Sequence, residues 1–175
     1  MGGSSEKVTV GYRYYLGVHF ALCHGPIDYI TRINVDDRLA WSGLAVDEQI
    51  TIDAPGLFGG DEREGGIAGD VDVMMGADDQ LENDYLQARF GDNIPAYRGI
   101  VSVVARRIYM GLNPYLKKWA FRAQRVFVSS GGVEQWYREK APTGETRKTG
   151  PFLSSARQNL WFLVWFREFH PEARE

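Results

Sequence analysis

The sequence predicts a mainly β fold, an antiparallel barrel or sandwich, with one short helix inside the domain and a second helix near the C-terminus. Aromatic residues make up 13% of the 175 residues, and glycine contributes 20 of them. Aromatic side chains favour strands, and glycine permits the tight turns that join them. Several segments also alternate apolar and polar residues, which is the pattern of a half-buried strand. Together these features predict about seven strands.

Four strands are predicted before residue 54. Residues 8–23 carry apolar and aromatic side chains at period two and are followed by a Gly-Pro break. Residues 27–35 and 38–41 are expected to pair as a hairpin around a two-aspartate turn. The odd-numbered side chains of the first of these two strands would share one face. Residues 49–53 form the fourth predicted strand.

A glycine-rich loop and a short helix are predicted in the middle of the chain. Residues 57–66 form the loop, and residues 67–75 form the strand that follows it. Asp79 is expected to cap the helix, because Glu82 lies three residues later, as in a capping box. Gly91 is expected to end the helix.

The second half contains the strongest strand pattern. Residues 97–110 are rich in β-branched side chains, and residues 115–128 are predicted to return as their antiparallel partner. A shorter strand is expected at residues 133–137. The composition changes after residue 140, and residues 154–169 form an aromatic stretch that predicts the C-terminal helix.

These elements suggest three regions. Residues 1–7 are a leader or linker, residues 8–140 form a β-rich domain, and residues 141–175 form a linker and an aromatic tail. The longest apolar run covers residues 160–166 and is too short for a membrane span. The single cysteine, Cys23, excludes an internal disulfide.

The net charge of −3 hides an asymmetry. Residues 1–100 hold seven basic and 17 acidic side chains, whereas residues 101–175 hold 13 and six. Such polarity suits self-complementary packing between subunits, or one acidic and one basic face on a single fold. The sequence does not separate these alternatives.

No group of residues predicts a catalytic, cofactor or metal site, so the chain is not expected to be an enzyme. His19, Cys23, His24 and Asp28 are of metal-ligand types. On one strand, however, His19 and Cys23 would share a face and His24 would point away, so the side chains do not converge. The acids between residues 61 and 84 lack the spacing of a calcium loop.

The predicted basic hairpin could bind nucleic acid through its positive charges and its aromatic rings. Its aromatic side chains alternate with the bases and would therefore lie on the opposite face, towards the core. No sequence-specific nucleic-acid partner is predicted. The basic side chains are Arg106, Arg107, Lys117, Lys118, Arg122 and Arg125.

Five motifs in order resemble the N-terminal part of the tail hub proteins of long-tailed bacteriophages and prophages. These proteins are also called tip attachment or host-specificity proteins, and gene transfer agents have similar hubs. The motifs are LGVHFALCHGP (16–26), VDDRLAW (35–41), LFGGDEREGG (57–66), PAYRG (95–99) and NPYLKKWAFR (113–122).

This resemblance implies a structural, non-catalytic virion protein at the tail tip, present in the host cytoplasm during assembly. Family hubs are β-barrel-like units that assemble as a trimeric ring and join the tail tube to the tip or fibres. The implied partners are two further copies of the chain and other tail tube and tail tip proteins. Two alternatives remain: a carbohydrate- or receptor-binding β module of a tail tip, and a cell-wall hydrolase.

Overall fold

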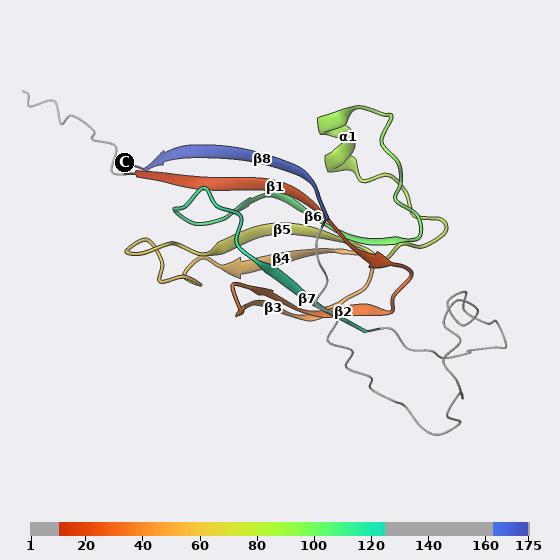
Figure 1. Ribbon diagram of the computed structural model, residues 1–175, viewed down its shortest axis with the longest axis horizontal. Helices are drawn as coiled ribbons and strands as arrows, with labels where there is room; N and C mark the ends of the chain where they lie inside the picture. Colours follow the sequence, from red (N-terminus) through yellow and green to blue (C-terminus); the bar gives the residue numbers. More distant parts are fainter. Residues whose placement is uncertain (1–10, 125–162, 175) are drawn as a thin grey trace, which may run out of the picture.

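The computed structural model describes residues 11–124 and 163–174, which form two antiparallel sheets and one short helix (Figure 1). The large sheet has the strand order β4-β5-β6-β1-β8, and the small sheet has the order β3-β2-β7. The mainly β prediction is confirmed, and the sheets pack face to face without closing into a barrel. The elements are β1 Gly11–His24, β2 Tyr29–Val35, β3 Arg38–Ala45, β4 Gln49–Ala54, β5 Ile67–Met74, α1 Asp84–Phe90, β6 Ile100–Tyr109, β7 Trp119–Gln124 and β8 Leu163–Arg174.

The main core lies between the two sheets. Alternate side chains of β1, including Leu16, Val18 and Phe20, are at most 1% exposed and point towards the small sheet. Trp119 of β7 meets them from the other side, with its ring 5.3 Å from that of Phe20. The inner face of each sheet therefore supplies half of one apolar layer.

The outer face of the large sheet supports α1. The helix begins after Asn83, whose side chain accepts a hydrogen bond from the amide of Leu86, and it ends at Gly91 as predicted. The prediction of Asp79 as N-cap is wrong. Leu86 packs with Met74 and Val104 in a second apolar cluster on this face.

A β-bulge in β6 turns two arginines to this outer face. The register with β1 jumps from Leu16–Ile108 to Val18–Ala105, so Arg106 and Arg107 lie opposite Gly17 alone. Arg107 has a φ of 45°, which lets the strand take up the extra residue. A similar irregularity in β2 breaks the predicted alternation, so Ile30 is buried although it is even-numbered.

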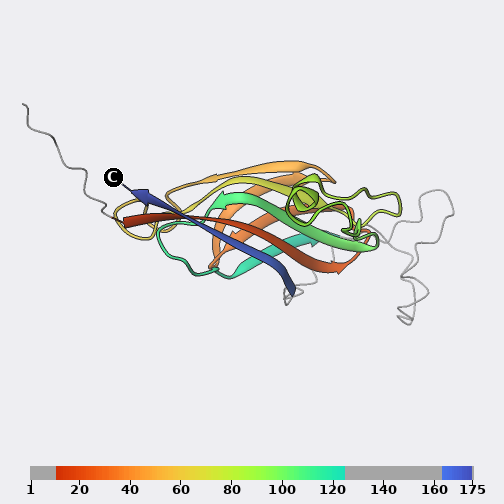
Figure 2. The ribbon, with the colours of Figure 1, turned by 90° about the horizontal axis from the view of Figure 1, so that it is seen from above.

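Two predictions about strand pairing and type are wrong. β7 pairs with β2 of the small sheet and not with β6, so the basic hairpin does not form. The predicted C-terminal helix is a strand from residue 163 onwards, because β8 pairs with β1 along almost its whole length (Figures 1 and 2). The strand predicted at residues 133–137 lies outside the described residues.

Candidate functional site

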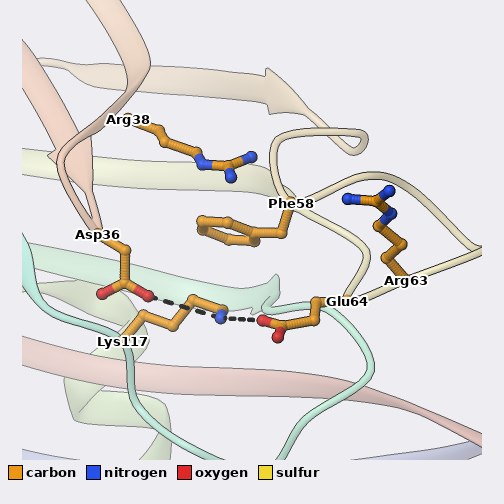
Figure 3. A pocket seen from close by; sticks show the side chains of 6 residues that line it. All are labelled: Asp36, Arg38, Phe58, Arg63, Glu64 and Lys117. Atoms are coloured by element: carbon orange, nitrogen blue, oxygen red, sulfur yellow. Dashed lines mark hydrogen bonds and ion pairs between the residues drawn. The ribbon is translucent and has the colours of Figure 1, made fainter.

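Three connections that are distant in the sequence meet at one end of the two sheets. They are the β2–β3 turn, the loop of residues 57–66, and the β6–β7 connection (Figures 1 and 3). We call this region the loop end. It surrounds a hollow of about 320 Å³ that is lined by Asp36, Arg38, Phe58, Arg63, Glu64 and Lys117.

The β2–β3 turn is fixed by its two aspartates. Asp36 and Asp37 both have positive φ, 45° and 62°, as a two-residue hairpin turn of this kind requires. The Asp36 amide donates to the Lys118 carbonyl at 2.8 Å, and the Lys118 amide donates to Asp36 Oδ1 at 2.9 Å. These bonds join the turn to the β6–β7 connection.

The glycine-rich loop is folded back on itself. Gly60 and Gly65 form an isolated bridge, in which the Gly65 amide donates to the Gly60 carbonyl at 2.7 Å. Gly65 has a φ of 76°, and a Cβ there would overlap the Tyr109 hydroxyl, so the position requires glycine. The Phe58 amide donates to the Gly65 carbonyl at 2.9 Å, which holds the Phe58 ring in a buried position.

Lys117 and Arg38 lie on opposite sides of the Phe58 ring (Figure 3). Lys117 Nζ is 4.2 Å from the ring centroid, 2.7 Å from Glu64 Oε2 and 3.6 Å from Asp36 Oδ2. The guanidinium of Arg38 is 5.7 Å from the same centroid and donates to the Leu57 carbonyl at 2.6 Å. One ring therefore stabilises two cations, and these three side chains join the three connections.

The electrostatics of the loop end favour a fixed, charged surface. The Lys117 ammonium, through its hydrogen bond and charge, lowers the pKa of Glu64. Only 11% of the Lys117 side chain is exposed, so the amine is enclosed by its partners. The lining residues include no serine, cysteine or histidine to act as a nucleophile or base. Their arrangement suits rigid non-covalent contact.

The metal-ligand types near β1 are not brought together. A bulge between Ala21 and Cys23 breaks the alternation of β1, so Cys23 packs against the inter-sheet core. His19 points to the outer face, where its ring meets Tyr97 edge-on at 4.6 Å. The prediction that His19 and Cys23 share a face is therefore wrong. His24 is exposed and Asp28 is half-buried.

The predicted acidic segment lines a second hollow, of about 470 Å³, beside α1. Asp72 there is 7% exposed and accepts hydrogen bonds from Gln49, Asn83 and Arg106. Arg106 also pairs with Asp84, which lowers the pKa of that carboxyl through a hydrogen bond. In residues 11–124 and 163–174, no three His, Cys, Asp or Glu side chains are grouped to hold a metal ion.

The predicted basic segment is divided between separate places. Arg106 and Arg107 lie on the outer face of the large sheet, and Arg107 pairs with Glu172 of β8 at 2.5 Å. Lys117 lies at the loop end. Arg122 lies on the small sheet, and Arg125 falls outside the described residues. The described bases therefore form no single stripe along a groove.

Sequence reasoning missed Arg38 and Phe58. The available signal was the pair of glycine dipeptides that flank residues 61–64, which indicated a loop but not the contacts that it makes. A second signal was the opposite charges of Asp36 and Arg38, two positions apart in the turn.

Comparison with protein-family models and with curated proteins finds no match to this sequence. Among the described residues, no helix has the length and apolar character needed to cross a membrane.

Proposed function

We propose that this chain is a structural, non-catalytic domain of a phage or prophage tail tip, a hub domain that links the tail tube to the tip or fibres. In this proposal three copies act together with other tail proteins at the end of the tail. Before that, the chain is present in the host cytoplasm during assembly.

The observation that supports the proposal most directly is the grouping of the five resembling motifs. Motifs 35–41, 57–66 and 113–122 together build the loop end. Motifs 16–26 and 95–99 meet at the opposite end, where the Gly25 amide donates to the Gly99 carbonyl at 2.8 Å (Figure 1). Short motifs that are spread over a hundred residues thus contribute to two compact sites.

The chemistry of these sites agrees with a structural role. The charged groups of the loop end are held by ion pairs and by the Phe58 ring, which leaves a shaped and charged surface. Backbone hydrogen bonds hold the opposite end, including one from Gly99 to the Gly76 carbonyl at 3.0 Å. Contacts between virion proteins depend on such fixed surfaces, whereas catalysis requires a poised acid, base or nucleophile.

The alternative of a carbohydrate-binding module has less support. Such a module would present tryptophan on a concave face, but Trp119 is 1% exposed and Trp41 packs against the core. The third residue of interest, Trp136, lies outside the described residues.

The proposal is tested by locating the protein on particles. Phage-like particles released by the organism that encodes the chain are purified and labelled with a gold-conjugated antibody against residues 11–124. We expect gold at the distal end of the tail, and a control antibody against the tail tube should label the shaft. Particles without label, with the chain only in the soluble fraction, would refute the proposal.

A further inference from the structure

The outer face of the small sheet carries two arginines directly opposite each other. Arg32 of β2 pairs in register with Arg122 of β7, and the following pair in the ladder is Ile33 with Phe121. Ile33 and Phe121 are buried in the core, so the two arginines point away from it. Both arginines are exposed.

This arrangement is unfavourable in an isolated molecule. Like charges that face each other across an antiparallel pair repel. Within the described part of the chain, neither Arg32 nor Arg122 forms an ion pair. The neighbouring strand β3 adds two exposed leucines, Leu39 at 48% and Leu44 at 62%. We call these four residues the basic face.

A complementary surface lies on the far side of the molecule. Thr51 of β4 pairs in register with Asp70 of β5, and Asp53 follows two residues later on β4. Ile50 and Ile52, on either side of Thr51, are buried, so Asp53 and Asp70 project from the outer face of the large sheet. Neither aspartate forms an ion pair with a described residue. With exposed Asp47 and Glu48 just before β4, they make up the acidic face.

The two faces cannot neutralise each other within one molecule. The sheets pack through their inner faces, so the outer faces of the small and large sheets point in opposite directions. Contact between them therefore requires two copies arranged head to tail. Such a heterologous contact leaves one free face at each end, which either closes as a ring or continues as a filament.

We propose that the basic face of one copy docks on the acidic face of a second copy of this chain. The inference deepens the tail-hub proposal, on which its biological role rests, by naming the surfaces that join neighbouring copies. Arginines that lie beside exposed apolar side chains are typical of protein interfaces. The acidic partner supplies the charge that Arg32 and Arg122 lack.

The test uses two full-length variants that each lose one face. Arg122→Glu places an acid opposite Arg32 and removes the basic face, while the double variant Asp53→Lys/Asp70→Lys reverses the acidic face. Light scattering after size exclusion at low salt measures the mass. The wild type should form a defined oligomer that weakens as salt rises, and each variant alone should be monomeric.

Mixing the variants gives the decisive result. Each variant keeps the face that the other lacks, so the mixture should form a 1:1 dimer and nothing larger. Charge-matched controls elsewhere, Arg89→Glu and Glu62→Lys/Asp92→Lys, should retain the wild-type mass. The Tm of Arg122→Glu should rise, because the repulsion with Arg32 is replaced by attraction, and this would show that lost assembly is not lost folding.

Two results would overturn the inference. One is a wild-type chain that stays monomeric at its highest soluble concentration in low salt. The other is an oligomer whose mass neither face variant changes. If either result came with gold label at the tail end, the docking surfaces would be refuted and the tail function retained. If the chain assembled as described but no gold label appeared at the tail, the docking surfaces would be retained and the tail function refuted.

Discussion

The inner face of the large sheet is packed with apolar side chains, whereas its outer face holds several buried polar groups beside α1. On the inner face, Phe20 meets Trp119 and Phe121 at ring distances of 5.3 and 5.8 Å. On the outer face, Asp72 and His19 are 7% and 1% exposed. Contacts of the first kind depend on shape and area, and those of the second depend on charge, partner and pH.

This difference predicts which changes in conditions each face will sense. Apolar burial responds weakly to pH and moderate salt. The outer face joins α1 to the sheet through Arg106, which contacts Asp72 of β5 and Asp84 of α1. Loss of charge on either carboxyl therefore weakens the attachment of the helix without changing the inter-sheet core.

The largest effect is expected on the inner face. Trp119→Ala should lower the free energy of unfolding by about 3–5 kcal/mol, because it removes a large buried ring and leaves a cavity. Urea unfolding at pH 7 measures this change. Tyr115→Ala, where the ring is 74% exposed, is the control and should change stability by less than about 0.5 kcal/mol. A loss below about 1 kcal/mol for Trp119→Ala would contradict the two-sheet packing.

The next effect tests the polar attachment of α1. Asp72→Ala should cost about 2–3 kcal/mol, because it leaves Asn83 and Arg106 without their buried acceptor, although Arg106 keeps Asp84. Asp92→Ala, at an exposed position just after α1, is the control and should have a small effect. Hydrogen exchange should locate the loss in α1, and uniform loosening of both sheets would argue against this role.

The third expected effect is a dependence of stability on pH, which arises on the outer face. Burial lowers the pKa of His19 to about 4. Below about pH 6.5 the unfolded chain binds a proton that the folded chain does not, so stability should fall as pH decreases from 7 to 4. The expected loss is about 2 kcal/mol between pH 7 and pH 5. This window lies above the range in which carboxyls protonate.

Substitution separates His19 from other titrating groups. His19→Gln keeps a polar side chain of similar size but does not titrate, so unfolding measured at pH 7 and pH 5 should differ much less than in the wild type. His24→Gln, at the exposed end of β1, is the matched control for the loss of a histidine. A His19→Gln protein with unchanged pH dependence would refute the assignment.

The sequence predicted the strands with local signals and failed where distant partners decide. The hairpin of β2 and β3 was predicted because its turn is local, and Gly91 was predicted because a helix stop is local. The predicted pairing of β7 with β6 was wrong, since a segment that follows β6 closely can still cross to the other sheet. The C-terminal helix prediction was wrong over its described residues, 163–169, for the same reason, because pairing with β1 overrides an ambiguous apolar pattern.

The candidate site shows the same limit. The glycines of residues 57–66 indicated a loop, but nothing in the spacing placed Lys117 beside Glu64, 53 positions away. The bulge near Cys23 was equally hard to predict, and it removed that side chain from the face that it was expected to share with His19. Element types were therefore largely predictable, whereas contacts between elements required the fold.

The smallest effect on stability is expected at the loop end. This region tests the contrast between apolar packing and charge, because it combines an aromatic contact with exposed ion pairs. Lys117→Met keeps an unbranched apolar chain against Phe58 but removes the ammonium, so we expect a loss of about 1 kcal/mol in urea unfolding at low salt. The pKa of Glu64 should rise towards its ordinary value in an NMR titration, since its main stabilising partner is gone. Lys118→Met is the matched control, because that side chain is 72% exposed and 3.9 Å from Asp37.

High salt should reduce the difference in the free energy of unfolding between wild type and Lys117→Met. The difference between wild type and Trp119→Ala should stay unchanged. A Lys117 effect that is independent of salt would mean that the loop end is held by packing, as the inner face is, and not by charge.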